Sequence, residues 1–230
     1  LPRQMALDLR PITVPITASG FADGVIDRLV PGLPGVTIAS SAQAARPAAP
    51  ALTLAPGDAV GVGLLSGDFS IGATGTVTHV DGDKVYAFGH PLYNLGPTAF
   101  PMTRADVIAV LPSLVTSSKL ASLGAVVGTI SQDRATAIAG RLGAPPPLVP
   151  VTLTLNSKRA PSRTFNFQVV NDELFTPLLT YLAVANVLTS YERQTGAATY
   201  TLTGDARIAA QPPIRFDDVF AARLLARQQP

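Results

Sequence analysis

Apolar and polar residues alternate along much of the chain, and this period of two is typical of half-buried β-strands. Residues 11–18 contain two prolines, which favours an edge strand because proline donates no hydrogen bond to a ladder. Asp81-Gly82-Asp83 supplies the positive-φ residues of a tight turn, so we expect a hairpin over residues 74–88. The alternation predicts strands at 57–87, 126–131, 136–139, 148–155, 163–170, 197–203 and 206–210.

Four other stretches carry helix signals. A short helix is expected between Ser19 and Pro31, and Thr103-Arg104-Ala105-Asp106 matches a capping box before the apolar residues 107–111. Thr176-Pro177 predicts the start of the longest helix, which should run to about residue 188 or just beyond. Asp217 or Asp218 should open a C-terminal helix. The composite prediction is a mainly β fold, with two to three helices in its main domain.

The residues between the first elements and the main β region differ in composition from both. Residues 40–56 are rich in Ala and Pro and hold one charge, which favours an extended connector over part of a core. We therefore expect a strand-helix segment at 1–40, a connector at 41–56 and a β domain at 57–230. The chain begins Leu-Pro-Arg-Gln, without an initiator Met, which is typical of a mature fragment or a piece of a longer protein.

Composition excludes several classes of function. The chain has no cysteine and two histidines, which argues against disulfides, a cysteine nucleophile and a zinc site. A net charge of +2 gives no basic surface for nucleic acid. The apolar stretch at 178–188 is shorter than the roughly 20 residues of a membrane-spanning helix. The glycines between 57 and 75 are not followed by Gly-Lys-Ser/Thr, so we expect no bound nucleotide. We also expect no other cofactor and no metal.

The residues able to support catalysis each allow a second interpretation. His90 follows a strand and a glycine, where an imidazole can act as a general base or be satisfied by backbone groups. The glycine-flanked Ser66 and Ser70 are the nearest candidates for a nucleophile, yet both suit turns. Asp133 could orient His90 or pair with Arg134 or Arg141 at the surface. His79 has no metal-ligand partner at a useful spacing, and Asp172 has no evident role.

Two segments resemble the SpoIVB-type serine peptidases, the peptidase family of stage IV sporulation protein B. They are Gly75-Thr76-Val77-Thr78 through Ala87-Phe88-Gly89-His90-Pro91, and a weaker match at Gly128-Thr129-Ile130, Gln132-Asp133-Arg134 and residues 137–143. The similarity covers about residues 57–143. It implies a chymotrypsin-related β-barrel that cleaves a protein or peptide substrate, with His90 at the position of the catalytic histidine.

One family feature is missing. The nucleophile of the family lies in a Gly-Met-Ser-Gly-Ser-Pro segment, which does not occur in this chain. In some longer bacterial relatives this segment lies upstream of the hairpin. The hypotheses are therefore a serine endopeptidase whose nucleophile comes from an upstream segment, or a catalytically inactive peptidase-like module that binds a protein partner. A carbohydrate-binding or structural β-sandwich is a third possibility. Sparse charge and an Ala/Pro-rich composition favour an exported protein of the bacterial cell envelope.

Overall fold

The computed structural model describes residues 14–22, 24–26, 36–40, 53–111, 118–158, 160–192 and 196–224. By its internal contacts the chain divides into Leu1–Asn186 and Val187–Pro230. Most of the 41–56 connector lies outside the described residues, so the domain boundary expected there stays a prediction.

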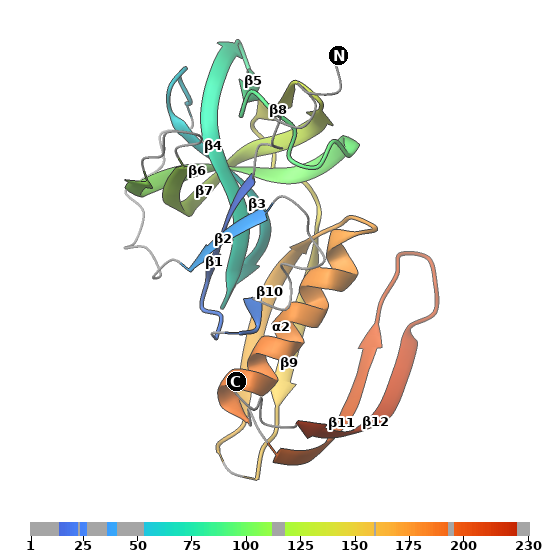
Figure 1. The fold of residues 1–230 in the computed structure, drawn as a ribbon. Coiled ribbons are helices and arrows are strands. Elements are labelled where there is room, and N and C mark those ends of the chain that lie inside the picture. The colour runs from blue at the N-terminus through green and yellow to red at the C-terminus, as the bar shows by residue number, and fades with distance from the viewer. Residues whose placement is uncertain are drawn as a thin grey trace, which may run out of the picture. The chain divides into compact units, whose positions relative to one another are not determined.

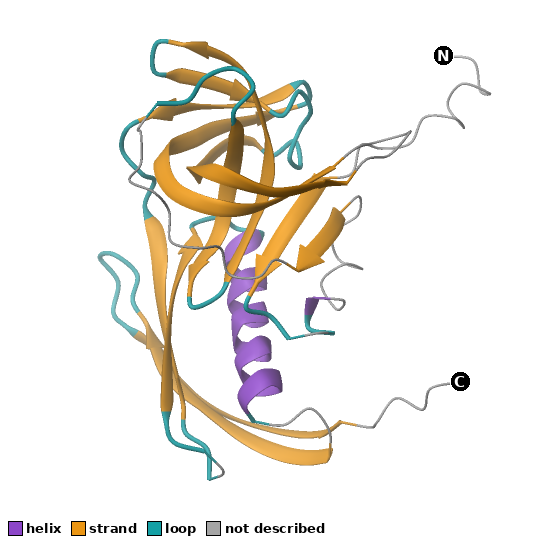
Figure 2. Ribbon diagram, turned by 90° about the vertical axis from the view of Figure 1, so that its left-hand side faces the viewer, coloured by secondary structure: helices purple, strands orange, loops and turns teal. Residues whose placement is uncertain are grey.

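Most of the described chain is β structure, as the alternation predicts, and Figure 2 shows the strands with one long helix, α2. In the first unit ten strands form one sheet, labelled in Figure 1. They are β1 (Val14–Ser19), β2 (Val36–Ser40), β3 (Ala59–Gly67), β4 (Ser70–Asp81), β5 (Lys84–Ala87), β6 (Gly96–Leu111), β7 (Ser118–Arg134), β8 (Ala137–Leu142), β9 (Leu148–Leu155) and β10 (Arg163–Val170).

The strand pairings of this sheet close on themselves. β3, β4 and β5 pair in sequence, β5 pairs with β8, β8 with β7, β7 with β6, and β6 returns to β3. Three successive antiparallel strands with the fourth beside the first make a Greek key, here β6-β3-β4-β5. β1 pairs with the first half of β4, and β10 with the end of β3. β4 is long enough to pair first with β1 and β3 and then with β5 (Figure 1).

The core follows the inward-facing positions of these strands. Apolar residues of β3, β4, β5, β6, β7 and β8 are nearly or fully buried, because alternate side chains of a strand point to the same face. They include Val60, Val62, Ala73, Val77, Val85, Ala87, Phe100, Met102, Ile130 and Ile138. The predicted hairpin with its turn at Gly82 (φ 60°) is confirmed, and so are the strands at 148–155 and 163–170.

The helix α2 (Phe175–Tyr191) confirms the longest predicted helix, but its N-terminal cap lies earlier than expected. Asp172 accepts hydrogen bonds from the backbone N–H groups of Leu174 and Phe175, and its own N–H donates to Thr176 Oγ1. This arrangement gives Asp172 the capping role that Thr176 was expected to fill. At the far end of the buried face, Asn186 accepts from Ala22 N–H and donates to the Gly20 carbonyl, which fixes the segment after β1.

Three predicted elements are wrong. Residues 103–111 belong to the strand β6, because this β-branched stretch pairs with β7 along its whole length and that ladder outweighs a local capping box. The C-terminal helix is instead the strand β12 (Ile214–Leu224), which pairs with β11 (Gly196–Ala206) in a separate two-stranded sheet. The strand expected at 206–210 is mostly the connection between these two. Of the helix expected between Ser19 and Pro31, residues 19–22 and 24–26 are described and show one turn, in which the Val25 N–H donates to the Ala22 carbonyl, and the rest lies outside the described residues.

Candidate catalytic loop

The loop of residues 88–95, which we call the His90 loop, connects β5 to β6 and has an unusual backbone. Phe88 and Asn94 have φ angles of 72° and 58°, and Gly89 has 73°. Glycine adopts this left-handed conformation freely, but it costs a residue with a Cβ about 1–2 kcal/mol. Such strain persists only where the surrounding contacts fix the conformation. We therefore look to the contacts of His90, Asp133 and Phe88 for what holds the loop in this conformation.

His90 is half-buried, and a hydrogen bond to its own neighbour sets its protonation pattern. Its Nδ1 lies 2.8 Å from the carbonyl oxygen of Pro91. A carbonyl oxygen only accepts, so Nδ1 must carry the proton in this contact. In the neutral ring the lone pair then resides on Nε2, for which the described residues provide no hydrogen-bond partner. Among the described residues, the ring is therefore hydrogen-bonded through Nδ1 alone.

Asp133 is fully buried and holds the backbone that follows His90. Its carboxylate accepts hydrogen bonds from the N–H groups of Leu92 (2.8 Å), Tyr93 (2.8 Å) and Leu95 (3.1 Å). The position follows from the β6–β7 register, in which Asp133 is the partner of Gly96 at the beginning of β6. The carboxylate therefore organises the loop through its amides, and no hydrogen bond joins it to the imidazole in the described residues.

The surface ion pair considered for Asp133 is wrong. Arg141 instead binds both carboxylate oxygens of Asp83, at 2.9 and 2.7 Å, and holds the pKa of that exposed carboxyl below its usual value. Arg134 donates from Nε to Gln132 Oε1. An isolated carboxylate without exposure is costly unless it is fully hydrogen-bonded, which is why Asp133 collects three backbone donors.

Aromatic rings pack on both sides of the His90 loop. The ring of Phe88 lies 5.6 Å from that of His90, between centroids, and Tyr93 lies 5.6 Å from Phe175 of α2. The Tyr93 hydroxyl is buried without a hydrogen-bond partner, and burial raises the pKa of Tyr93 to about 12. Sequence reasoning assigned no role to Phe88 or Tyr93. The only sequence signal is their position, because Phe88 lies within the segment from Gly75 to Pro91 and Tyr93 lies two residues after it.

Ser66 does not join His90 and Asp133. It is exposed at the end of β3, opposite Gln168 of β10, while the preceding residue, Leu65, pairs with Ile71. The His90 loop begins after Ala87, the last residue of β5, which pairs with Val77 in the middle part of β4. Six residues of strand separate Ile71 from Val77, about 20 Å at 3.3 Å per residue. Ser70, at the beginning of β4, lies at the same distant end.

The strand pairing also brings Thr76, which carries a hydroxyl, to the beginning of the loop. The Phe88 N–H donates to the Thr76 carbonyl at 2.9 Å, which places Thr76 across from the beginning of the loop. Its Oγ1 accepts a 2.6 Å hydrogen bond from Lys119 Nζ. An ammonium donates to this hydroxyl and cannot act as the base that would activate it, so Thr76 is a poor candidate for a nucleophile.

The glycines of β3 and β4 have a packing role. A Cβ on Gly61 or Gly72 would come under 3.0 Å from the side chain of Leu123 in β7, so the bare backbone gives Leu123 its place. Within the described residues, no group of three or more potential metal ligands comes together. His79 is exposed on β4, with its ring 6.2 Å from that of Tyr86.

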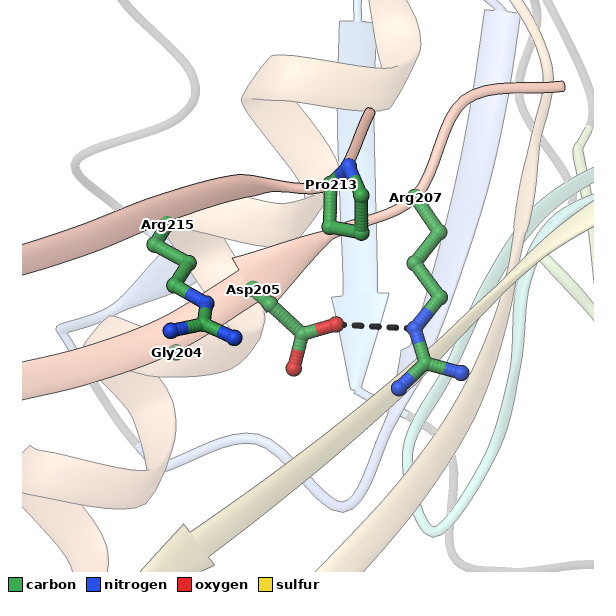
Figure 3. Close-up of a pocket in the computed structure, with 5 residues that line it drawn as sticks. All are labelled: Gly204, Asp205, Arg207, Pro213 and Arg215. Atoms are coloured by element: carbon green, nitrogen blue, oxygen red, sulfur yellow. Dashed lines mark hydrogen bonds and ion pairs between the residues drawn. The ribbon is translucent and has the colours of Figure 1, made fainter. Parts of the chain in front are cut away.

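A surface hollow of about 330 Å³ lies in the second unit, on the β11–β12 ribbon, and contains none of the candidate residues. Figure 3 shows Asp205 between Arg207 and Arg215, with its ion pair to Arg207 at 2.9 Å. Both partners of that pair are exposed, so the pair contributes little. The hollow lacks a buried polar group or a base, and we assign it no function.

No helix of the described residues combines the length and the apolar character needed to span a membrane. No family model, no curated protein and no solved structure matches this chain.

Proposed function

We propose that this chain is the histidine-bearing part of a SpoIVB-type serine endopeptidase, in which His90 is the general base. The observation that carries the proposal is the hydrogen bond from His90 Nδ1 to the Pro91 carbonyl, which leaves the lone pair on Nε2, a nitrogen without a partner among the described residues. In a serine peptidase that nitrogen takes the proton of the nucleophile. Here a backbone carbonyl performs the orienting task, and Asp133 secures the loop on which both groups lie.

The strand pairing supports a second element of the proposal, namely that the fold is a chymotrypsin-related β-barrel. Six strands, β3 to β8, form a closed cycle of pairings that contains a Greek key. A closed cycle of antiparallel strands removes the free sheet edges, as barrels do. The His90 loop connects two strands of this cycle, β5 and β6.

The proposed nucleophile is a serine of an upstream segment, because Ser66 and Ser70 lie where β3 ends and β4 begins, about 20 Å along β4 from Val77, which pairs with Ala87. As the serine Oγ attacks the carbonyl carbon of the scissile peptide, its proton passes to His90 Nε2. Backbone N–H groups bind the oxyanion that forms. His90 then gives the proton to the leaving amine, the acyl-enzyme remains, and water hydrolyses it by the same route. The reaction needs no cofactor.

The test is active-site labelling followed by intact-mass spectrometry. This chain and a version extended upstream are treated with a fluorophosphonate probe, each with a His90→Ala control. The proposal expects labelling of the extended form only, and its loss in His90→Ala. Labelling of the short chain would identify a local serine and contradict the upstream assignment. Labelling that survives His90→Ala would remove His90 from the mechanism, and the absence of any labelling would remove the peptidase function.

A second candidate function is a catalytically inactive module that binds a protein partner in the bacterial cell envelope. The observation that favours it is the apolar surface of β12, where four large side chains are about 40–70% exposed: Ile214, Phe216, Val219 and Phe220. A Phe220→Ser variant would lose such a partner in a pulldown from envelope extracts while its secondary structure stays unchanged. Retention of the partner by this variant would contradict this use of β12.

A further inference from the structure

The ring of Phe88 is seated on Gly75 and next to His90. Its centroid lies 5.6 Å from that of the His90 ring, with the two planes inclined at 46°. A Cβ on Gly75 would fall under 3.0 Å from three carbon atoms of the same ring. The glycine of β4 therefore forms the floor against which this ring packs.

Space, rather than backbone conformation, explains the glycine. Gly75 is not among the positive-φ residues, so any residue could adopt its backbone conformation. A larger residue at position 75 would leave no room for the Phe88 ring. An aromatic ring is rigid, so it can move away only as a whole.

The backbone of Phe88 is fixed at the same place. Its N–H donates to the carbonyl of Thr76, the residue after Gly75, and its φ angle of 72° turns the chain toward His90. Phe88 thus contacts β4 twice, through its N–H and through its ring. These two contacts hold a conformation that a residue with a Cβ rarely adopts.

We propose that Gly75 and Phe88 are positioning residues that fix the His90 imidazole in the orientation in which Nδ1 donates to the Pro91 carbonyl. The ring of Phe88 limits the rotation of His90 on one face, and Gly75 determines where that ring lies. The catalytic consequence rests on the proposed function, whereas the effect on the imidazole does not. An imidazole released from this contact would populate both neutral tautomers in water, and Nε2 would no longer be a fixed base.

The experiment reads the imidazole directly. Two-bond ¹H–¹⁵N correlation spectra of the ¹⁵N-histidine-labelled chain show which ring nitrogen carries the proton. The chain has two histidines, so a His79→Gln variant assigns the signals. The variants are Gly75→Ala and Phe88→Leu. Gly63→Ala is the matched control, a strand glycine whose added Cβ would meet its neighbours at 3.6 Å or more.

We expect wild type and Gly63→Ala to show His90 protonated at Nδ1 alone. Gly75→Ala and Phe88→Leu should show a mixture of the two tautomers, and Phe88→Tyr, which keeps the ring, should restore the single form. In the extended protein, fluorophosphonate labelling should slow about 100-fold in the first two variants, the loss that a misplacement of about 1 Å causes. Phe88→Leu removes no backbone contact and serves if Gly75→Ala does not fold.

The results separate this inference from the proposed function. A single Nδ1-protonated tautomer in both folded variants would overturn the inference, whatever the labelling shows. A tautomer mixture in these variants supports it. If wild type is never labelled while the variants show the mixture, the positioning of His90 stands and the peptidase proposal fails.

Discussion

Replacing Asp133 tests the account of the His90 loop most directly. Its carboxylate is fully buried and accepts three backbone N–H groups at 2.8, 2.8 and 3.1 Å. Asp133→Ala leaves these donors without an acceptor, and breaking a buried charged arrangement of this kind costs about 3–5 kcal/mol. Asp133→Asn keeps the shape and one acceptor oxygen, but its NH₂ group faces an N–H donor. We expect it to cost about 2 kcal/mol, the strength of one charge-assisted hydrogen bond.

The assays are urea unfolding and thermal unfolding at pH 7, combined with amide hydrogen exchange. A loss of about 2 kcal/mol lowers the Tm of a chain of this size by roughly 4–8 °C. The amides of Leu92, Tyr93 and Leu95 should lose protection in both variants, before global unfolding. Asp83→Asn is the control, because it removes an exposed carboxylate that also binds an arginine, and we expect no measurable change.

Either of two results would contradict the role that we assign to the Asp133 carboxylate in holding the His90 loop. In the first, Asp133→Ala unfolds at the same urea concentration as the control Asp83→Asn, so that burial and the three donors contribute nothing. In the second, the three amides keep their protection in Asp133→Ala, so that another group holds the loop.

Two further predictions concern buried polar groups. Tyr93→Phe should raise the stability by about 1 kcal/mol in thermal unfolding at pH 7, because it removes a buried hydroxyl that has no partner. Burial raises the pKa of Tyr93 to about 12, so between pH 10 and 12 the tyrosine ionises in the unfolded state first. Wild type should therefore lose stability relative to Tyr93→Phe over this range. Unfolding free energies that change with pH in parallel for the two proteins would contradict this. Asn186→Ala should cost about 2–4 kcal/mol in urea unfolding, because the Gly20 carbonyl and the Ala22 N–H both lose their partner, and a smaller loss would show that water replaces the amide.

Local signals in the sequence were reliable where one short segment holds the necessary information. The turn at Gly82 needs a positive φ, and Asp-Gly supplies it within the hairpin itself. The strands β9 and β10 alternate strictly and pair along their full length, so their bounds could be predicted. The helix α2 could be predicted from its apolar residues, although its cap at Asp172 could not, since several polar residues precede the helix.

Local signals failed where a distant strand competes for the segment. Residues 103–111 carry a capping box, yet this stretch, rich in β-branched residues, pairs with the strand β7 up to Leu111, with register shifts on the way. In the same way, Asp217 and Asp218 resemble a helix start, but their partners across the ribbon are Thr203 and Leu202 of β11. Only the pairing shows that the alternation of Ile214, Phe216 and Phe220 is that of a strand.

The sequence by itself determined that the fold is mainly β and that His90 follows a hairpin and a glycine, because alternation and turn chemistry are local properties. Only the tertiary structure decided what surrounds this histidine. Asp133 follows it by more than forty positions in the sequence, and reaches its loop because β7 ends where β6 begins. The β4 ladder likewise brings Gly75 beneath Phe88 and keeps Ser66 away from His90. Register places residues that are distant in sequence side by side, and no local pattern records it.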